Sequence, residues 1–244
     1  MSNSIRIFSL PGLVPYQEAS ELQKKLVDFR ATDRIPDTIL FLEHEPVITR
    51  GRGLQGPDAR KQMPLATEDL PPMIQYAETE RGGDLTYHGP GQLVIYPIVK
   101  LDGKGFAPER DVGAFIRKLE QLLIDLLWTR GLSAKTKKNA TGVWVGEHKL
   151  ASIGIAVRKW VAYHGISINV VNHLAPFHLF APCGFDGKQM TRLADLTPDT
   201  LDSTNWRRPL EESLADAFGQ SRIEVARNPL SFVQVAPALD ISTS

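Results

Sequence analysis

Residues 81–92 hold four glycines, one proline and six hydrogen-bonding side chains, and they run directly into the apolar stretch 93–98. Glycine adopts positive φ angles and lets other groups approach the backbone closely. Proline within Gly-Pro-Gly excludes a helix and marks a tight loop. The pattern therefore predicts a loop before a buried strand, with backbone N–H groups available to a polar part of a ligand. A purely structural turn is the alternative, and glycine content alone does not decide between the two.

The spacing of these glycines matches neither the dinucleotide-binding GxGxxG pattern nor the phosphate-loop GxxxxGK[ST] pattern. The loop is therefore expected to hold something other than a nucleotide phosphate.

Length and composition favour one α/β domain over residues 1–244, ending in a C-terminal tail over about 228–244. Equal numbers of basic and acidic residues give zero net charge, which argues against nucleic acid as a partner. No apolar run approaches the length of a membrane span, and the N-terminal residues lack a signal-peptide layout. The single cysteine excludes an internal disulfide. These features together predict a cytoplasmic protein.

The histidines and the cysteine show no metal-ligand spacing, and His44 and His148 lie among charged residues, so no metal is expected. Apolar periodicity predicts helices and strands in alternation in the first half of the chain and a run of strands in the second. The predicted strands are residues 5–10, 38–42, 75–80, 93–99, 142–145, 149–157 and 160–171. The predicted helices are residues 13–30 opened by Pro15, a helix from Asp111 closed by Gly131, and the segments 189–196 and 206–218.

Two further groups of glycines in the sequence are unusual for the elements predicted around them. The loop at residues 50–57 is rich in glycine and arginine, and its composition favours a flexible, solvated segment. Gly154 and Gly165 interrupt predicted strands, where glycine weakens pairing and tends to mark close backbone approach.

Cys183 lies between Pro182 and Gly184 in a predicted loop. A lone cysteine is more often a buried hydrophobe than a nucleophile, and nucleophilicity requires a thiolate stabilised by a cation, a base or a helix N-terminus. Candidate partners are Lys149, Lys188, His88, His164 and His178, and spacing does not choose among them. Lys149 begins a strand, a position where lysine is usually solvated; pointing into a cleft, it would stabilise a thiolate or act as a base.

Four sequence blocks occur in a fixed order over roughly residues 38–196. They are Arg81-Gly-Gly-Asp-Leu-Thr-Tyr-His-Gly-Pro-Gly-Gln92, then Gly-Val-Trp-Val with Lys149-Leu-Ala-Ser-Ile-Gly154, then His164-Gly with Asn169-Val, and finally Phe180-Ala-Pro-Cys-Gly184. In these blocks the chain resembles the octanoyltransferase family, the lipoyl(octanoyl) transferases of lipoate synthesis. The resemblance implies a mixed sheet flanked by helices, like the catalytic domains of lipoate and biotin protein ligases.

The resemblance also implies an activity: transfer of an octanoyl group from acyl carrier protein to a lysine on a lipoyl domain, with no cofactor. The expected acceptors are lipoyl domains of 2-oxoacid dehydrogenase subunits and the H protein of glycine cleavage, and the enzyme is expected to be a monomer. Carried over by position, Cys183 is the nucleophile that forms a thioester and Lys149 its catalytic partner. The substrate site would comprise Arg81, Gly82, Gly83, Asp84, Leu85, Thr86, Tyr87, His88, Ser152, Ile153, Gly154, Gly165, Ile166 and Ser167.

Gly154 and Gly165 would then make room for the fatty chain, with Leu85, Ile153 and Ile166 around it. His88 is interpreted as a positioning residue rather than the base, and His164 as a residue that satisfies backbone groups near Gly165. The chain departs from the family pattern at Gln189-Met-Thr-Arg-Leu193, at residues 50–52 and at 58–75, which puts partner-facing loops in doubt. The rival interpretations are an ATP-dependent lipoate or biotin ligase, a cysteine thioesterase and a non-catalytic acyl-carrier-binding protein.

Overall fold

The computed structural model describes residues 5–54, 70–104, 106–180, 187–197, 206–220, 222–226 and 229–230. Its strands are β1 (Arg6–Val14), β2 (Thr38–His44), β3 (Val47–Arg50), β4 (Gln75–Glu78), β5 (Leu85–His88), β6 (Gln92–Lys100), β7 (Ala134–Lys135), β8 (Gly142–Val145), β9 (His148–Arg158), β10 (Val161–Asn169) and β11 (Ile223–Val225). Its α-helices are α1 (Tyr16–Ala31), α2 (Val112–Trp128), α3 (Leu193–Leu196) and α4 (Arg207–Ala217).

Over this described part of the chain, the strands form an eight-stranded sheet of order β11-β1-β2-β6-β10-β9-β8-β7 and a small sheet of order β4-β3-β5. The pairs β1–β2, β1–β11 and β3–β4 are parallel, whereas the other neighbours are antiparallel. The predicted mixed sheet flanked by helices is therefore confirmed.

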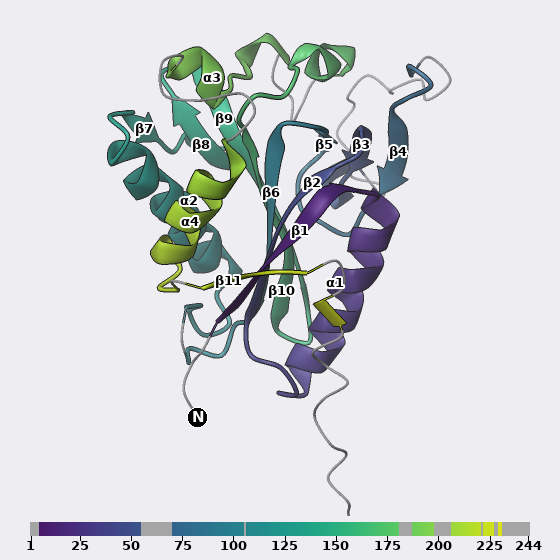
Figure 1. Ribbon diagram of the computed structural model, residues 1–244, viewed down its shortest axis with the longest axis vertical. Coiled ribbons are helices and arrows are strands. Elements are labelled where there is room, and N and C mark those ends of the chain that lie inside the picture. Colours follow the sequence, from purple (N-terminus) through teal and green to yellow (C-terminus); the bar gives the residue numbers. More distant parts are fainter. Residues whose placement is uncertain are drawn as a thin grey trace, which may run out of the picture.

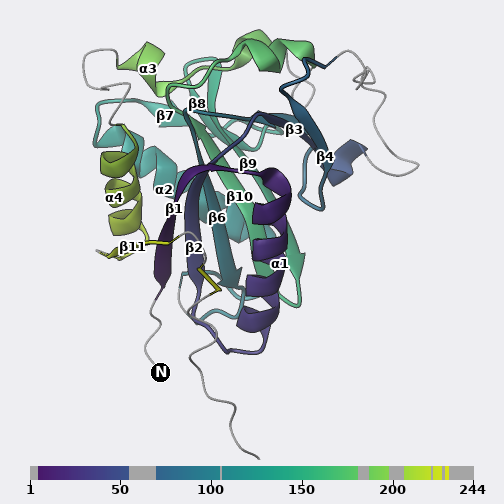
Figure 2. The ribbon, with the colours of Figure 1, turned by 45° about the vertical axis from the view of Figure 1, so that its right-hand side comes forward.

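Helices cover both faces of the large sheet: α1 lies on one side, and α2 and α4 lie on the other (Figure 1). Figure 2 shows α1 running beside β6 and β10, which it contacts. Both faces are apolar, as β2 illustrates. Its alternate side chains Ile39 and Phe41 belong to the core beneath α2 and α4, whereas Leu40 and Leu42 belong to the core beneath α1, because successive residues of a strand point to opposite faces.

The helix expected from Asp111 is confirmed, since the Asp111 carboxylate caps α2 by accepting from the Ala114 N–H at 2.7 Å. The strand order β8-β9-β10 confirms the predicted meander. The helix expected over 189–196 was wrong in extent, because a 3₁₀ turn at Gly187–Gln189 precedes the single helical turn α3. Strand β11 was not predicted: its three residues are too few for a periodic pattern, and it exists as a parallel partner of β1.

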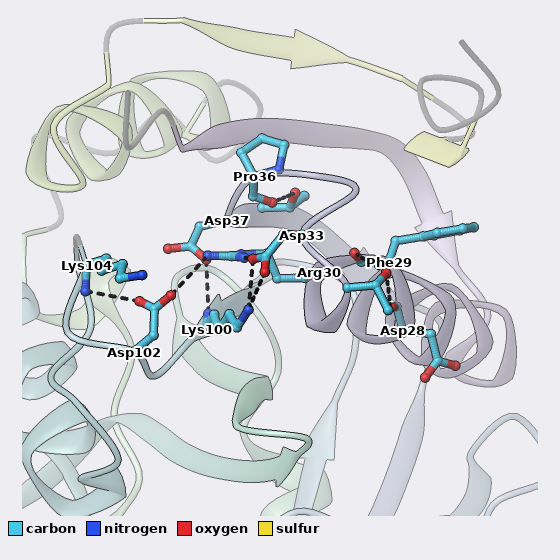
Figure 3. Close-up of polar contacts among 11 residues, drawn as sticks. Asp28, Phe29, Arg30, Asp33, Pro36, Asp37, Lys100, Asp102 and Lys104 are labelled. Carbon is cyan, nitrogen blue, oxygen red and sulfur yellow. Dashed lines mark hydrogen bonds and ion pairs between the residues drawn. The ribbon is translucent and has the colours of Figure 1, made fainter. Parts of the chain in front are cut away.

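The C-terminal end of α1 is anchored by a charged cluster, defined here as Arg30, Asp33, Asp37, Lys100 and Asp102 (Figure 3). The Arg30 Nε donates to the Asp37 carboxylate at 2.6 Å, and both side chains are buried. The ammonium of Lys100 bonds both oxygens of Asp33, at 2.6 and 2.8 Å. Each cation thus has an anion, and the cluster ties α1 to β2 and β6.

Among the described helices, none has the length and apolar character needed to cross a membrane.

Candidate active site

A cavity lies where the loop before β5 meets strands β9 and β10. Its volume is about 40 Å³. Its lining comprises Tyr16, Arg81, Gly82, Gly83, Thr86, His88, Val94, Tyr96, Lys149, Ser152, Ile153, Gly154, His164, Gly165, Ile166 and Ser167. Most of the residues that the sequence assigned to a substrate site are therefore brought together in one place.

The register of β9 and β10 explains how two separate sequence blocks meet at the cavity. Gly154 pairs with Gly165, Ile153 with Ile166, and Ser152 with Ser167. The loop before β5 joins them, because the Gly82 N–H donates to the Ile155 carbonyl at 3.0 Å.

Three predicted site residues do not line the cavity. In β5, Thr86 and His88 face it, whereas Leu85 and Tyr87 pack into a separate apolar cluster with Ile48 and Phe177. The alternation of side chains along a strand separates them, so a continuous run of strand residues cannot all contact one ligand. Leu85 therefore lies outside the lining of this cavity.

Asp84 also stays outside the cavity lining and instead holds the neighbouring loop. Its carbonyl accepts from the Gly51 N–H at 2.9 Å, the Arg81 carbonyl accepts from Arg52 at 2.9 Å, and Gly83 accepts from Gly53 at 3.0 Å. A Cβ on Gly51 would lie 2.2 Å from the Gly83 oxygen. Residues 51–53 are held by these backbone hydrogen bonds, and their glycines permit close packing against residues 81–84. Arg52 and Gly53 are nevertheless exposed, as expected for a solvated loop. Residues 55–69 lie outside the described part of the chain.

Arg81 is buried, and its guanidinium holds the glycine loop together. It donates to the Thr49 carbonyl at 2.7 Å, the Asp84 carbonyl at 2.8 Å and the Gly82 carbonyl at 3.1 Å. A positive charge at the cavity wall lowers the cost of a nearby anion. Arg81 therefore combines a structural role with a favourable electrostatic one.

The two strand glycines permit close packing against neighbouring backbone. A Cβ on Gly154 would lie 2.9 Å from the Gly82 oxygen, and one on Gly165 would lie 2.1 Å from the Ile95 oxygen. The glycine loop and β6 thus pack directly against these positions, and both glycines line the cavity.

Lys149 is buried rather than solvated, with 4% of its surface exposed, and it lines the cavity. Its ammonium lies 5.8 Å from the centre of the Trp144 ring. Gly142, which the sequence did not single out as a site residue, makes this position possible: its φ is +127°, and a Cβ there would lie 2.7 Å from Lys149 Cε. The Gly142 N–H donates to the Glu120 carboxylate at 2.9 Å, which fixes the strand end in place.

The predicted nucleophile, Cys183, lies outside the described residues, as do 181–186 as a whole. The side chain of Lys188 lies outside the described part of the chain. Of the other candidate partners for a thiolate, Lys149, His88 and His164 line the cavity and His178 does not.

Three histidines, His44, His88 and His164, form a buried imidazole cluster with Tyr16 and Tyr96. Burial lowers the pKa of His44 and of His164 to about 4 each, and it holds the pKa of His88 well below its usual range. Burial also raises the pKa of Tyr16 to about 12. The cluster is therefore uncharged near neutral pH.

His164 does not satisfy backbone groups with its ring, contrary to expectation. Its backbone N–H donates to the Gln23 side chain at 2.7 Å, while Nε2 has no hydrogen-bond partner among the described residues and lies 3.7 Å from a Glu80 oxygen. Its φ of +57° is unusual for a residue with a side chain. The ladder between β10 and β6 is broken at this point, opposite Pro97.

Sequence reasoning missed Tyr16, Val94 and Tyr96 as lining residues. Val94 and Tyr96 lie two apart on β6, as do Thr86 and His88 on β5, so strand alternation was the available signal. Tyr16 gave no such signal, because it reaches the cavity only through the packing of α1.

Comparison with known proteins agrees with this geometry. Residues 15–215 match the lipoyl protein ligase A/B catalytic domain family. An octanoyltransferase of Dictyoglomus thermophilum is 41% identical over 200 residues, 82% of this chain and 78% of that protein. An octanoyltransferase of Solibacter usitatus is 43% identical over 188 residues, 76% and 80% of the two chains. The fold is similar to that of a bi-partite lipoate protein ligase from Thermoplasma acidophilum, with a TM-score of 0.64, 16% identity and coverage of 95% and 91%.

The fold and the glycine-lined cavity thus define a catalytic domain of the lipoyl protein ligase type. Within that class, the chain belongs to the octanoyltransferase family. It is accordingly an acyltransferase. The part of the chain that the structure describes contains no group of three or more acidic, histidine or cysteine side chains placed to hold a metal ion.

Proposed function

We propose that this enzyme transfers an octanoyl group from octanoyl-acyl carrier protein to the ε-amine of a lysine on a lipoyl domain, by way of a thioester on Cys183. The acceptors would be lipoyl domains of 2-oxoacid dehydrogenase subunits and the H protein of glycine cleavage. Membership of the octanoyltransferase family supports the reaction class. The T. acidophilum ligase, which has the same fold, was analysed with its E2 lipoyl domain.

The observation that carries the proposal is the buried ammonium of Lys149 in a cavity walled by glycine loops. An ammonium beside a thiol stabilises the thiolate, which is the nucleophilic form of cysteine. Backbone N–H groups directed at the carbonyl oxygen in a glycine loop stabilise the tetrahedral oxyanion by about 3–4 kcal/mol per donor in comparable sites. The cavity therefore has the chemistry of acyl transfer.

The reaction needs no nucleotide. In the first step the thiolate attacks the octanoyl thioester and the carrier thiol leaves, so one thioester replaces another. In the second step the lysine amine attacks the enzyme thioester, and the resulting amide is the more stable product. The apolar lining, Val94, Ile153 and Ile166, would favour an aliphatic chain by about 0.8 kcal/mol per buried methylene. This free energy limits selectivity to about fourfold per carbon, so transfer of neighbouring chain lengths is expected.

The test is intact-mass analysis after incubation with octanoyl-acyl carrier protein, followed by peptide mapping and a chase with an unmodified lipoyl domain. We expect an octanoyl adduct on Cys183 that the lipoyl domain removes. Cys183→Ala should form no adduct and transfer nothing, and Lys149→Met should form the adduct far more slowly. Lys100→Met is the matched control, because its ammonium is paired in the charged cluster, remote from the cavity lining.

Other results would identify the rivals. Transfer by Cys183→Ala with octanoate and ATP would indicate a nucleotide-dependent ligase. Release of free octanoate without an acceptor, at the rate of transfer, would indicate a thioesterase. Tight binding of the carrier without any adduct would indicate a non-catalytic binding protein.

A further inference from the structure

The His88 ring lines the cavity, and its Nδ1 lies 2.7 Å from the Oε1 of Gln92. An amide side chain can present either its oxygen or its NH₂ group to a histidine, and the two choices fix opposite tautomers. The partners around Gln92 decide between them, because two backbone carbonyls terminate the hydrogen-bond network.

The first terminus is the Thr191 carbonyl, which only accepts. The NH₂ of Asn169 must therefore face it, at 2.9 Å, which leaves the Asn169 Oδ1 to accept from Gln92 at 2.9 Å. Gln92 then presents its NH₂ to Asn169 and its oxygen to His88. The direction of each donor is fixed by the one before it.

Two independent contacts give the same orientation. The Gln92 NH₂ also lies 3.1 Å from the Tyr87 carbonyl, a second group that only accepts. The Asn169 oxygen accepts a further bond from Asn172 at 3.1 Å, and Asn172 in turn uses its oxygen for the Val170 N–H. Flipping Gln92 or Asn169 would set oxygen against oxygen at buried positions, where an unsatisfied polar group costs about 1–3 kcal/mol.

The network therefore requires that His88 carry its proton on Nδ1. Its Nε2 is then an unprotonated acceptor, and no hydrogen bond among the described residues engages it. Burial, the neighbouring His44 and the charge of Arg81 favour the neutral ring by lowering the pKa of His88. A ring in this state cannot donate to a carbonyl oxygen, so it takes no part in stabilising an oxyanion.

We propose that His88 Nε2 accepts a hydrogen bond from the attacking lysine amine in the second step and so directs the nitrogen lone pair at the thioester carbon, and that Gln92 and Asn169 are positioning residues that fix the required tautomer. This inference rests on the function proposed above. As the nitrogen–carbon bond forms, the carbon–sulfur bond of the enzyme thioester breaks and the amine proton leaves with the departing sulfur. The His88 ring stays neutral throughout.

The same network reaches the strand that carries Lys149. The Thr191 N–H donates to the Lys149 carbonyl at 3.0 Å, and Met190 pairs with Lys149 in an isolated bridge. The residue that fixes the His88 tautomer through its carbonyl thus also fixes the backbone of Lys149 through its N–H. Thr191 therefore helps to position both His88 and Lys149.

The tautomer can be measured without any assay of activity. In protein labelled with ¹⁵N-histidine, two-bond ¹H–¹⁵N correlations distinguish a protonated from an unprotonated ring nitrogen, and His88→Asn identifies the His88 signals. We expect Nδ1–H with unprotonated Nε2 from pH 6 to pH 9, and a mixed or reversed population in Gln92→Met. An Nε2–H ring in the wild-type chain overturns the proposal, even if Gln92→Met fails to fold.

The role in catalysis is tested by following the two half-reactions of His88→Asn separately. Asparagine keeps a donor for Gln92 but loses the cavity acceptor, so acylation by octanoyl-acyl carrier protein should keep its rate. Transfer to the lipoyl domain should fall about 100-fold, and the loss should persist at high pH, because the missing group orients the amine and does not deprotonate it. His88→Gln restores an acceptor oxygen near the position of Nε2, so its transfer rate should lie between those of the wild type and His88→Asn. The control is His173→Asn, because His173 is exposed.

Equal slowing of both half-reactions, or transfer at the wild-type rate, overturns the role of His88 alone. If the wild-type chain never acquires an octanoyl adduct, the proposed function itself fails, and the amine role fails with it. The mass measurement and the half-reaction rates therefore separate the two failures.

Discussion

The two ends of α1 contact two buried polar clusters that are built in opposite ways. Arg30, near the C-terminal end, lies in the charged cluster, where each cation bonds an anion. Tyr16, about 21 Å away along the helix, lies in the imidazole cluster, where neutral rings contact one another and His164 Nε2 has no partner among the described residues. Buried charges that are fully paired stabilise the fold, whereas a buried polar atom without a hydrogen-bond partner can still bind a substrate.

The comparison implies that substitutions in the first cluster should damage stability and those in the second should damage catalysis. The following predictions test this division, in order of decreasing effect on stability.

Removing the Arg30 guanidinium should produce the largest loss of folding stability. Arg30→Met leaves the Asp37 carboxylate buried without its guanidinium partner, and breaking a buried pair in this way costs about 3–5 kcal/mol. Urea denaturation should show the loss, while the transfer rate of the folded fraction stays unchanged. Exposed Arg34→Met is the control and should change the free energy of unfolding by about 0.5 kcal/mol or less. A lower transfer rate in the folded fraction of Arg30→Met would contradict the assignment of stability to the charged cluster and of catalysis to the imidazole cluster.

Lowering the pH should destabilise the protein through the imidazole cluster. The pKa values of His44 and His164 are lowered by burial from 6.5 to about 4, so the unfolded chain binds protons that the folded chain does not. Stability that is fully present above pH 6.5 should therefore be lost as the pH falls toward 4, by up to about 3 kcal/mol per imidazole. Urea titrations at a series of pH values measure this loss.

The Asp33 carboxylate of the charged cluster should not share this loss of stability. Its hydrogen bonds to Lys100 and Arg30 lower the pKa of Asp33 below 3.8, so its contribution to stability is present above pH 3.8 and is lost only at lower pH. Burial instead raises the pKa of Asp37, so this carboxylate favours the folded state as the pH falls toward 3.8, opposite in sign to the imidazoles. His44→Gln should remove the contribution of one imidazole to the change in the free energy of unfolding between pH 6.5 and 4. A wild-type stability that is flat across this window would show that the buried rings are not held neutral.

A methyl group at Gly142 should destabilise the protein less than the loss of Arg30 and should also slow catalysis. Gly142→Ala sets a Cβ 2.3 Å from the Ala151 carbonyl oxygen and 2.7 Å from Lys149 Cε at a φ of +127°, a strain of about 1–3 kcal/mol. It should shift the start of β9 together with the Lys149 ammonium and slow formation of the acyl-enzyme. Gly146→Ala is the matched control: its φ is also positive, at +58°, but its Cβ would meet nothing within 4 Å. Equal acylation rates for the two variants would show that the position of Lys149 does not affect formation of the acyl-enzyme.

The sequence predicted much of the fold because its signals are local. Apolar periodicity and the Asp111 cap identified α2, and alternation identified the meander β8-β9-β10. The segments that depend on distant partners were missed, such as β11, which pairs with β1 across more than two hundred residues. The arrangement of the small sheet β4-β3-β5 also depends on tertiary packing, which no short window of sequence contains.

For the candidate site too, the sequence predicted the residues that belong to local motifs and missed those that depend on tertiary packing. Sequence blocks located Arg81, Lys149 and the strand glycines, all of which line the cavity. Leu85 and Tyr87 belong to the same sequence block, but they pack into the apolar cluster with Phe177 and do not line the cavity, because side chains alternate along a strand. The burial of His44 and the orientation of Gln92 could not be inferred, since each depends on hydrogen-bond partners far away in the chain.

The packing of residues 51–53 against residues 81–84 has a consequence for protein engineering. Because Gly51 and Gly53 leave no space for a Cβ beside Gly83 and Asp84, libraries that randomise one of these segments alone would mostly produce misfolded variants. A redesign of acyl preference should leave this double loop intact and diversify Val94, Ile153 and Ile166 instead, since these side chains project from rigid strands.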